Sequence, residues 1–206
     1  MKVKICGIQD EETAKVVVES GAEFIGFVFA KSKRKVSIEQ AKAIATTIPT
    51  TVKKVAVCVN PTMEEIETIM NEVGVDYIQL HGDETPAFCR QIPIPVIKAF
   101  PIKEQQDIQK VAEYEADYFL FDSPGGKYRG GSGMTFDWEM LRDVNIPREK
   151  VIVAGGLHPS NVKAAIQEVN PAIVDVSSGV ETDGKKDAKK IKQFIESAKQ
   201  FTQKER

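Results

Sequence analysis

The segment Val3-Lys4-Ile5-Cys6-Gly7 opens the chain with a short run of β-forming residues that stops at a glycine. Asp10, a good helix N-cap, follows closely, so the segment predicts a strand, a turn and a helix in that order. Because side chains alternate across a strand, Lys4 and Cys6 share one face while Val3 and Ile5 share the other. If this strand lines a barrel, Cys6 lies at the rim where the loops meet.

The same plan recurs along the chain. Helix signals include an N-cap at Ser37, Pro61-Thr62 at a helix start, and Gly21 and Gly74 as stops, with further helices expected over residues 104–114 and 188–201. Apolar runs predict strands over residues 3–6, 24–29, 54–59, 77–81, 96–100, 118–122, 151–154 and 173–176.

This alternation predicts parallel strands joined by right-handed crossovers. Eight such units in 206 residues fit a (β/α)8 TIM barrel of the α/β class. An open flavodoxin-like sheet would need only about five. No linker, low-complexity segment or sequence repeat divides the chain, so we expect a single barrel domain over residues 1–206.

Composition narrows the function classes. The net charge of −2 gives no reason to expect a nucleic-acid partner. Three cysteines without paired spacing argue against a disulfide scaffold and favour a reducing cytosol. There is no signal-peptide pattern and no apolar run near the roughly 20 residues of a membrane span. We therefore expect a soluble cytoplasmic protein without a membrane partner.

In such barrels the functional groups gather at the C-terminal ends of the strands. Polar or small residues from well-separated parts of this chain would meet there. The candidates are Cys6, Arg34, His81, Asp122, Gly155, Gly156, Asp175, Ser178 and Gly179.

Gly155-Gly156 and Ser177-Ser178-Gly179 follow the seventh and eighth strands. Without bulky side chains, backbone N–H groups and helix N-termini can close around a phosphate, and many barrels bind phosphate at this place. The alternative is that both segments are merely tight turns. Their joint occurrence after both strands favours a phosphate site.

Cys6 and Asp122 are the candidates for proton transfer. A free cysteine is commonly a small buried hydrophobe, which is how we interpret Cys58 and Cys89, but Cys6 differs by its position at the rim. Asp122 ends an apolar strand, where a carboxyl group either caps the next loop or, held partly desolvated, serves as a general acid.

The remaining polar candidates for the site, the two histidines and Arg34, can also be explained without a role in catalysis or binding. We interpret His81 first as a hydrogen-bonded rim histidine and keep it as a candidate for substrate binding; His158 belongs to a helix entry. Arg34 lies in a basic run that is typical of a solvated loop, although its planar fork suits a carboxylate. With no Cys or His cluster at ligand spacing, we predict no metal site.

Several segments, spread from the first strand to the final helix, form a recognisable set: residues 4–8, 26–29 with 32–34, 75–82 ending in Gln79-Leu80-His81-Gly82, 130–133 with 135–138, 154–157 and 174–181. Together they resemble the phosphoribosylanthranilate isomerases of tryptophan biosynthesis. Several of these motifs are specific to that family, whereas the phosphate-binding glycines occur in many phosphate-binding barrels.

The resemblance implies an Amadori rearrangement of N-(5-phosphoribosyl)anthranilate, a phosphorylated aminosugar, to 1-(2-carboxyphenylamino)-1-deoxyribulose 5-phosphate. It implies that Asp122 is the general acid, Cys6 the general base, and that Arg34 faces the anthranilate carboxylate. No cofactor is expected, because no nicotinamide or flavin step occurs. Cysteine normally has a pKa near 8.5, so little of Cys6 is thiolate at neutral pH unless the site lowers this value.

Two positions depart from the family pattern. Lys35 stands where an aromatic residue often follows the loop arginine, and Met134 follows the Gly130–Gly133 loop where a polar residue is common. Both bear on packing around the anthranilate ring and on the loop after the sixth strand, whose glycines make it a plausible lid.

Strand alternation gives one further prediction. Lys4 and Asp175 would both point inward on strands that become neighbours when the barrel closes, so we expect them to form an ion pair.

Three other functions compete with the isomerase. An indole-forming lyase needs a lysine at a strand end as its acid, and Lys54 and Lys98 fall within strands. A non-catalytic phosphometabolite-binding barrel would use Cys6 only for packing. A thiol redox role would need a resolving cysteine, and none lies beside Cys6 in the sequence.

For the oligomeric state, the sequence is compatible with a monomer or a homodimer.

Overall fold

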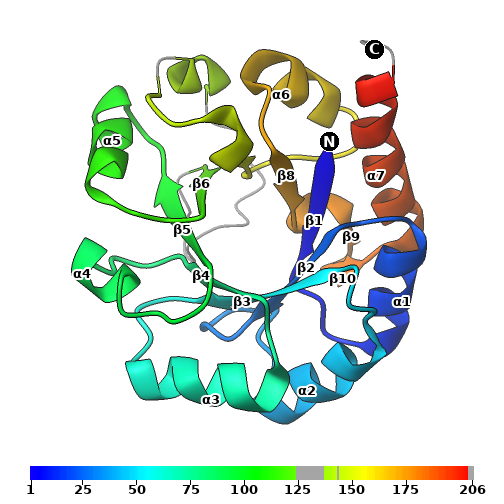
Figure 1. The fold of residues 1–206 in the computed structure, drawn as a ribbon. Coiled ribbons are helices and arrows are strands. Elements are labelled where there is room, and N and C mark those ends of the chain that lie inside the picture. Colours follow the sequence, from blue (N-terminus) through cyan, green and yellow to red (C-terminus); the bar gives the residue numbers. More distant parts are fainter. Residues whose placement is uncertain (124–136, 143, 204–206) are drawn as a thin grey trace.

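The computed structural model describes residues 1–123, 137–142 and 144–203, with side chains described up to residue 200. Its centre is a closed barrel of eight parallel strands in chain order, which confirms the predicted (β/α)8 fold (Figure 1). The strands are β1 (Lys2–Cys6), β2 (Phe24–Val28), β3 (Lys53–Cys58), β4 (Tyr77–Leu80), β5 (Val96–Pro101), β6 (Tyr118–Asp122), β7 (Val151–Val153) and β8 (Ile173–Val176).

Helices surround the barrel, and α7 lies between α6 and α1, so the last helix completes the ring beside the first (Figure 1). A short antiparallel hairpin, β9 (Glu181–Thr182) and β10 (Lys185–Lys186), precedes α7. The α-helices are α1 (Glu11–Glu19), α2 (Ile38–Thr47), α3 (Met63–Val73), α4 (Pro86–Cys89), α5 (Gln105–Gln109), α6 (Val162–Val169) and α7 (Ala188–Gln203).

The predicted helix signals are confirmed where the structure describes them. Asp10 and Ser37 accept backbone N–H groups of the first turns of α1 and α2. Thr62 forms a capping box with Glu65 at the start of α3, and Gly74 ends that helix with a φ of 68°. At this position glycine avoids the cost that a Cβ would bring in the left-handed region.

Two connections differ from a regular helix. The helix expected over residues 104–114 divides into α5 and a 3-10 turn, η1 (Lys110–Glu113). Such 3-10 turns, with hydrogen bonds between residues i and i+3, are frequent at the ends of short α-helices. Between β6 and β7 the described residues form only the 3-10 turns η2 (Trp138–Leu141) and η3 (Arg148–Lys150). The glycine loop at residues 130–133 lies outside the described residues.

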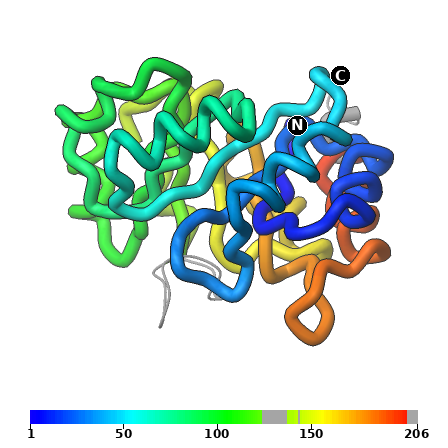
Figure 2. The backbone as a smooth tube through the Cα atoms, turned by 90° about the horizontal axis from the view of Figure 1, so that it is seen from below, coloured from blue at the N-terminus to red at the C-terminus, as the bar shows by residue number. Residues whose placement is uncertain are grey.

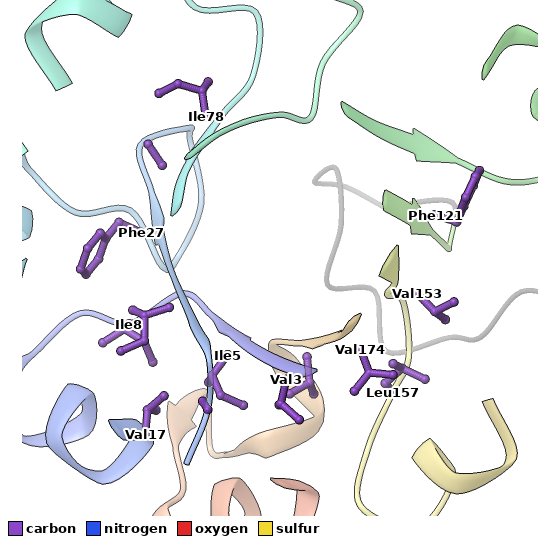
Figure 3. Close-up of a cluster of buried hydrophobic side chains, with 14 of the residues drawn as sticks. Val3, Ile5, Ile8, Val17, Phe27, Ile78, Phe121, Val153, Leu157 and Val174 are labelled. Atoms are coloured by element: carbon purple, nitrogen blue, oxygen red, sulfur yellow. The ribbon is translucent and has the colours of Figure 1, made fainter. Parts of the chain in front are cut away.

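The core has two layers that follow the alternation of side chains. One set of strand residues packs outward against the helices; Figure 3 shows Val3 and Ile5 of β1 beside Val174 of β8, close to Val17 of α1. The other set fills the barrel interior and includes Cys6. Because neighbouring positions on a strand face different layers, Cys6 points into the barrel, as the opening segment predicts.

Aromatic side chains close the N-terminal end of the barrel. Phe24, Tyr77 and Tyr118 are the first residues of β2, β4 and β6, and their ring centroids lie 5.8 to 6.4 Å apart. Such edge-on and tilted contacts pack the three rings together where the strands begin.

Loops build up that opposite end. The segment between β2 and α2 and the β9–β10 hairpin project from the same side of the molecule (Figure 2), and an ion pair between Arg34 and Glu181 joins them. Among the described residues, no helix combines the length and apolar character needed to cross a membrane.

Candidate functional site

A cavity of about 610 Å³ lies at the C-terminal ends of the strands. Most of the candidates chosen from the sequence line it: Cys6, Arg34, His81, Asp122, Gly155, Gly156, Asp175 and Ser178. Gly179 is not part of this lining. A Cβ at Gly179 would overlap the carbonyl oxygen of Leu157, so this glycine allows two loops to pack closely rather than facing the cavity.

Cys6 ends β1 and is 8% exposed. A Cβ at Gly26 would lie 2.9 Å from the Cys6 sulfur and 3.3 Å from Lys4 Nζ, so Gly26 makes room for both groups side by side. Burial raises the pKa of the Cys6 thiol, and the nearby Lys4 ammonium opposes this without cancelling it. The site therefore does not give Cys6 the lowered pKa of many reactive cysteines.

Lys4 and Asp175 form the predicted ion pair inside the barrel, with Lys4 Nζ 3.0 Å from Asp175 Oδ2. Lys4 is fully buried. Although burial works to lower the pKa of Lys4, the Asp175 carboxylate and Cys6 raise it above its ordinary value. Asp175 Oδ1 is buried and has no hydrogen-bond partner in the described part of the chain.

Asp122 ends β6 across the cavity and is 4% exposed. Its Oδ2 lies 3.2 Å from His81 Nε2. His81 Nδ1 is hydrogen-bonded to Gln79 Nε2 at 3.0 Å, which confirms the expected hydrogen-bonded rim histidine. Its Oδ1 is buried and unpartnered among the described residues. A Cβ at Gly155 would lie 2.7 Å from Oδ1, so the glycine backbone passes directly over the carboxyl group.

Gly155 and Gly156 have φ angles of 79° and 63°, a backbone region that L side chains rarely adopt. The loop is fixed by Asn161, whose Nδ2 donates to the Gly156 carbonyl at 3.0 Å. His158 lies in the same connection and leads into α6, where its carbonyl accepts the Val162 N–H. Successive residues of this kind turn backbone N–H groups toward one point, as in anion-binding loops.

Arg34 reaches the cavity from the loop after β2. Its Nε and Nη2 donate to the two carboxylate oxygens of Glu181 at 2.6 and 2.8 Å. Lys186 Nζ also contacts Glu181 Oε1, at 2.7 Å. The arginine expected to meet a substrate carboxylate is thus held by a protein carboxylate, and its Nη1 takes no part in that pair.

Lys186 extends this network to Cys6. It donates to the Ser177 carbonyl at 2.9 Å, and Ser177 Oγ donates to the Cys6 carbonyl at 3.1 Å. The β9–β10 hairpin is therefore tied to the ends of β8 and β1.

Sequence reasoning missed Gln79, Glu181 and Lys186. A signal existed for Gln79, because it is the polar residue at an inward position of an otherwise apolar strand, and it is 1% exposed. For Glu181 and Lys186 no spacing rule points to a partner, since they act from a hairpin that the strand pattern does not predict. A metal ion would be held by a cluster of acidic, histidine or cysteine side chains. The described residues include no group of three or more His, Cys, Asp or Glu side chains arranged to hold a metal ion.

The family model described as N-(5'phosphoribosyl)anthranilate (PRA) isomerase matches residues 3–197. The chain belongs to this isomerase family. An N-(5'-phosphoribosyl)anthranilate isomerase of Bacillus mycoides (strain KBAB4) is 54% identical over 201 residues, which is 97% of this chain and 98% of that relative.

Solved structures of the phosphoribosylanthranilate isomerase family share the fold. The enzyme from Thermotoga maritima is 43% identical, with a TM-score of 0.88 over 97% of this chain and 99% of that chain. A second structure, 40% identical with a TM-score of 0.85 over the same shares, is a complex with reduced 1-(o-carboxyphenylamino)-1-deoxyribulose 5-phosphate. The chain is therefore an isomerase of tryptophan biosynthesis, and nothing among these relatives supports a non-catalytic barrel.

The geometry also bears on the lyase alternative. Lys98 lies on the outward face of β5, buried with Glu84 at 2.8 Å and away from the cavity lining. It therefore cannot serve as an acid on a ligand in the barrel mouth.

Proposed function

We propose that this chain converts N-(5-phosphoribosyl)anthranilate to 1-(2-carboxyphenylamino)-1-deoxyribulose 5-phosphate by an Amadori rearrangement. One observation carries the proposal: the Cys6 thiol and the Asp122 carboxyl, from β1 and β6, line one cavity together with the paired glycines after β7. An acid and a base that face one small ligand from different strands are what this reaction requires.

The two proposed catalytic residues each transfer one proton, and a tautomerisation completes the reaction. The Asp122 carboxyl gives its proton to the furanose ring oxygen, and the C1–O bond breaks while the anthranilate nitrogen forms an iminium. The Cys6 thiolate then takes the proton from C2, and the electron pair of that C–H bond moves to form the enolamine. In the final tautomerisation the C2 hydroxyl loses a proton and C1 gains one, which gives the ketone. The proton taken by Cys6 replaces the one given by Asp122, so the product has the atoms and electrons of the substrate.

The surrounding residues suit the two ends of such a substrate. Gly155, Gly156 and Ser178 would hold the phosphate through backbone N–H and hydroxyl donors. Arg34 would use its Nη1 for the anthranilate carboxylate while Glu181 keeps the guanidinium in place. Asp175, which lines the cavity, would accept a sugar hydroxyl. A substrate of this kind and reduced cysteines fit the cytoplasm, which we propose as the compartment.

The test is turnover of freshly generated phosphoribosylanthranilate, followed by loss of its fluorescence. We expect Cys6→Ala and Asp122→Asn each to reduce kcat by about 10²-fold or more, the usual contribution of a positioned acid or base. Cys58→Ala is the matched control, because Cys58 is buried on the outward side of β3. Near-normal turnover by the Cys6 or Asp122 variant would remove that residue from the mechanism.

A further inference from the structure

Gln79 lies inside the barrel on β4, and the mechanism above gives it no role. Its side chain lines the cavity and is almost completely buried. The amide Nε2 lies 3.0 Å from His81 Nδ1, and His81 Nε2 lies 3.2 Å from Asp122 Oδ2. Gln79 is thus the first member of a chain of contacts that ends at the carboxyl group proposed as the acid.

The position of the proton on His81 follows from the chemistry of each group. An amide nitrogen can only donate, so His81 Nδ1 must accept and carry no proton. A neutral imidazole has one N–H, which must then be on Nε2. The N–H of His81 is therefore on Nε2, the nitrogen that lies 3.2 Å from Asp122 Oδ2.

This arrangement decides where the acid proton of Asp122 lies. A proton on Oδ2 would face the N–H of His81, so a protonated Asp122 carries its proton on Oδ1. Oδ1 is the oxygen that is buried, unpartnered among the described residues and next to the Gly155 backbone. We propose that Gln79 is a positioning residue: by fixing the tautomer of His81 it places the acid proton of Asp122 on Oδ1. The proposal rests on the function proposed above for Asp122.

The opposite orientation of the Gln79 amide would have the opposite consequence. Its oxygen would accept a proton carried by Nδ1, and Nε2 would become either an acceptor or part of a charged imidazolium. In the first case Asp122 would give its proton to His81 rather than to a ligand. In the second case Asp122 would be an ionised partner of His81. Either state makes Asp122 a poor acid.

Nuclear magnetic resonance of ¹⁵N-histidine-labelled protein tests the tautomer directly. The chain has two histidines, so a His158→Gln variant assigns both signals. We expect His81 in the wild-type protein at neutral pH to have an unprotonated Nδ1 and a protonated Nε2. In Gln79→Glu the carboxylate can only accept, and the proton should move to Nδ1 or occupy both nitrogens. A wild-type His81 with its proton on Nδ1 would overturn the proposal.

Kinetics separate positioning from a merely structural role. We expect Gln79→Glu to lower kcat about tenfold or more while KM changes little, and Gln91→Glu, an exposed site with the same change of charge, to have no effect. In a His81→Gln background the amide has no tautomer to fix, so Gln79→Glu should cause no further loss. An equal loss in that background would refute the proposal.

The two hypotheses fail in different ways. Wild-type protein that does not turn over the substrate contradicts the proposed function, whatever the state of His81. Turnover together with a proton on Nδ1 contradicts the role of Gln79 alone.

Discussion

At the scale of single residues, the Cys6 thiol is held between two opposing influences. Burial favours the neutral thiol, while the Lys4 ammonium favours the thiolate, and the net result is a raised pKa. The Cys6 thiolate, which we propose as the base, is therefore a minor species at neutral pH, and a proton that it accepts is held strongly afterwards.

The rate of alkylation measures this balance. Because only the thiolate reacts, we expect the reaction of Cys6 with iodoacetamide to rise with pH and to reach its midpoint above the value of about 8.5 of an ordinary cysteine. Lys4→Met removes the cation and should move the midpoint higher still. Mass spectrometry in a Cys58→Ala/Cys89→Ala background follows Cys6 alone. A midpoint below that of free cysteine would contradict the assigned balance.

Residues whose positions follow from strand alternation could be predicted from the sequence. Cys6, Asp122 and the Lys4–Asp175 pair are of this kind, because the inward face and the neighbouring strand are both fixed once the barrel is assumed. The pair between Arg34 and Glu181 could not be predicted, since it joins the loop after β2 to a short hairpin, and the two residues are 147 positions apart. No local pattern specifies such a contact.

At the scale of elements, a buried lysine organises the connection after β4. Lys98 Nζ donates to the carbonyls of Leu80 and Gly82 at 3.3 and 2.8 Å and to Glu84 at 2.8 Å. Glu84 in turn accepts the backbone N–H groups of Gly82 and Asn60. One cation thereby holds the loop that carries His81.

Removing that cation should loosen this loop. Lys98→Met leaves Glu84 buried without its partner, a change that typically costs about 3–5 kcal/mol. We expect the Gly82 and Asn60 amides to exchange with solvent about 10² times faster or more, as native-state hydrogen exchange would detect. Lys42→Met is the control, because the Lys42–Glu72 pair is more than half exposed. Equal exchange in both variants would show that Lys98 does not hold the loop.

Helices that begin with a capping side chain could be predicted from the sequence. The caps Asp10, Ser37 and Thr62 each bond the first turn of their helices, because their side chains match donors that every helix start leaves free. Of the two 3-10 turns before β7, η2 has a side-chain cap, because Asp137 Oδ1 accepts the Glu139 N–H at 3.0 Å. The turn η3 follows Pro147 and has no side-chain cap, so local sequence gave no signal for it.

At the scale of the whole molecule, the barrel closes where β1 pairs with β8, with Lys4 opposite Asp175 in register. The two residues are 171 positions apart, so their contact forms only when the chain has returned to its start. That the sheet closes into a barrel could be inferred from the eight predicted strands. The ion pair between Lys4 and Asp175 could then be predicted, because closure makes β1 and β8 neighbours. The Lys4–Asp175 pair therefore tests whether the seam stabilises the molecule as a whole.

Lys4→Met should lower the free energy of unfolding by about 3–5 kcal/mol, because it leaves the Asp175 carboxylate buried and uncompensated. Lys2→Met is a matched control on the same strand and the same seam; since Lys2 is exposed, its effect should stay within about 0.5 kcal/mol. Replacing both charges, in Lys4→Met/Asp175→Leu, should restore most of the loss, because an apolar pair of similar volume carries no desolvation cost. Urea denaturation compares the variants. If Lys4→Met is no less stable than Lys2→Met, the buried pair does not stabilise the closed barrel, and its place beside Cys6 must then be explained by the chemistry of the site alone.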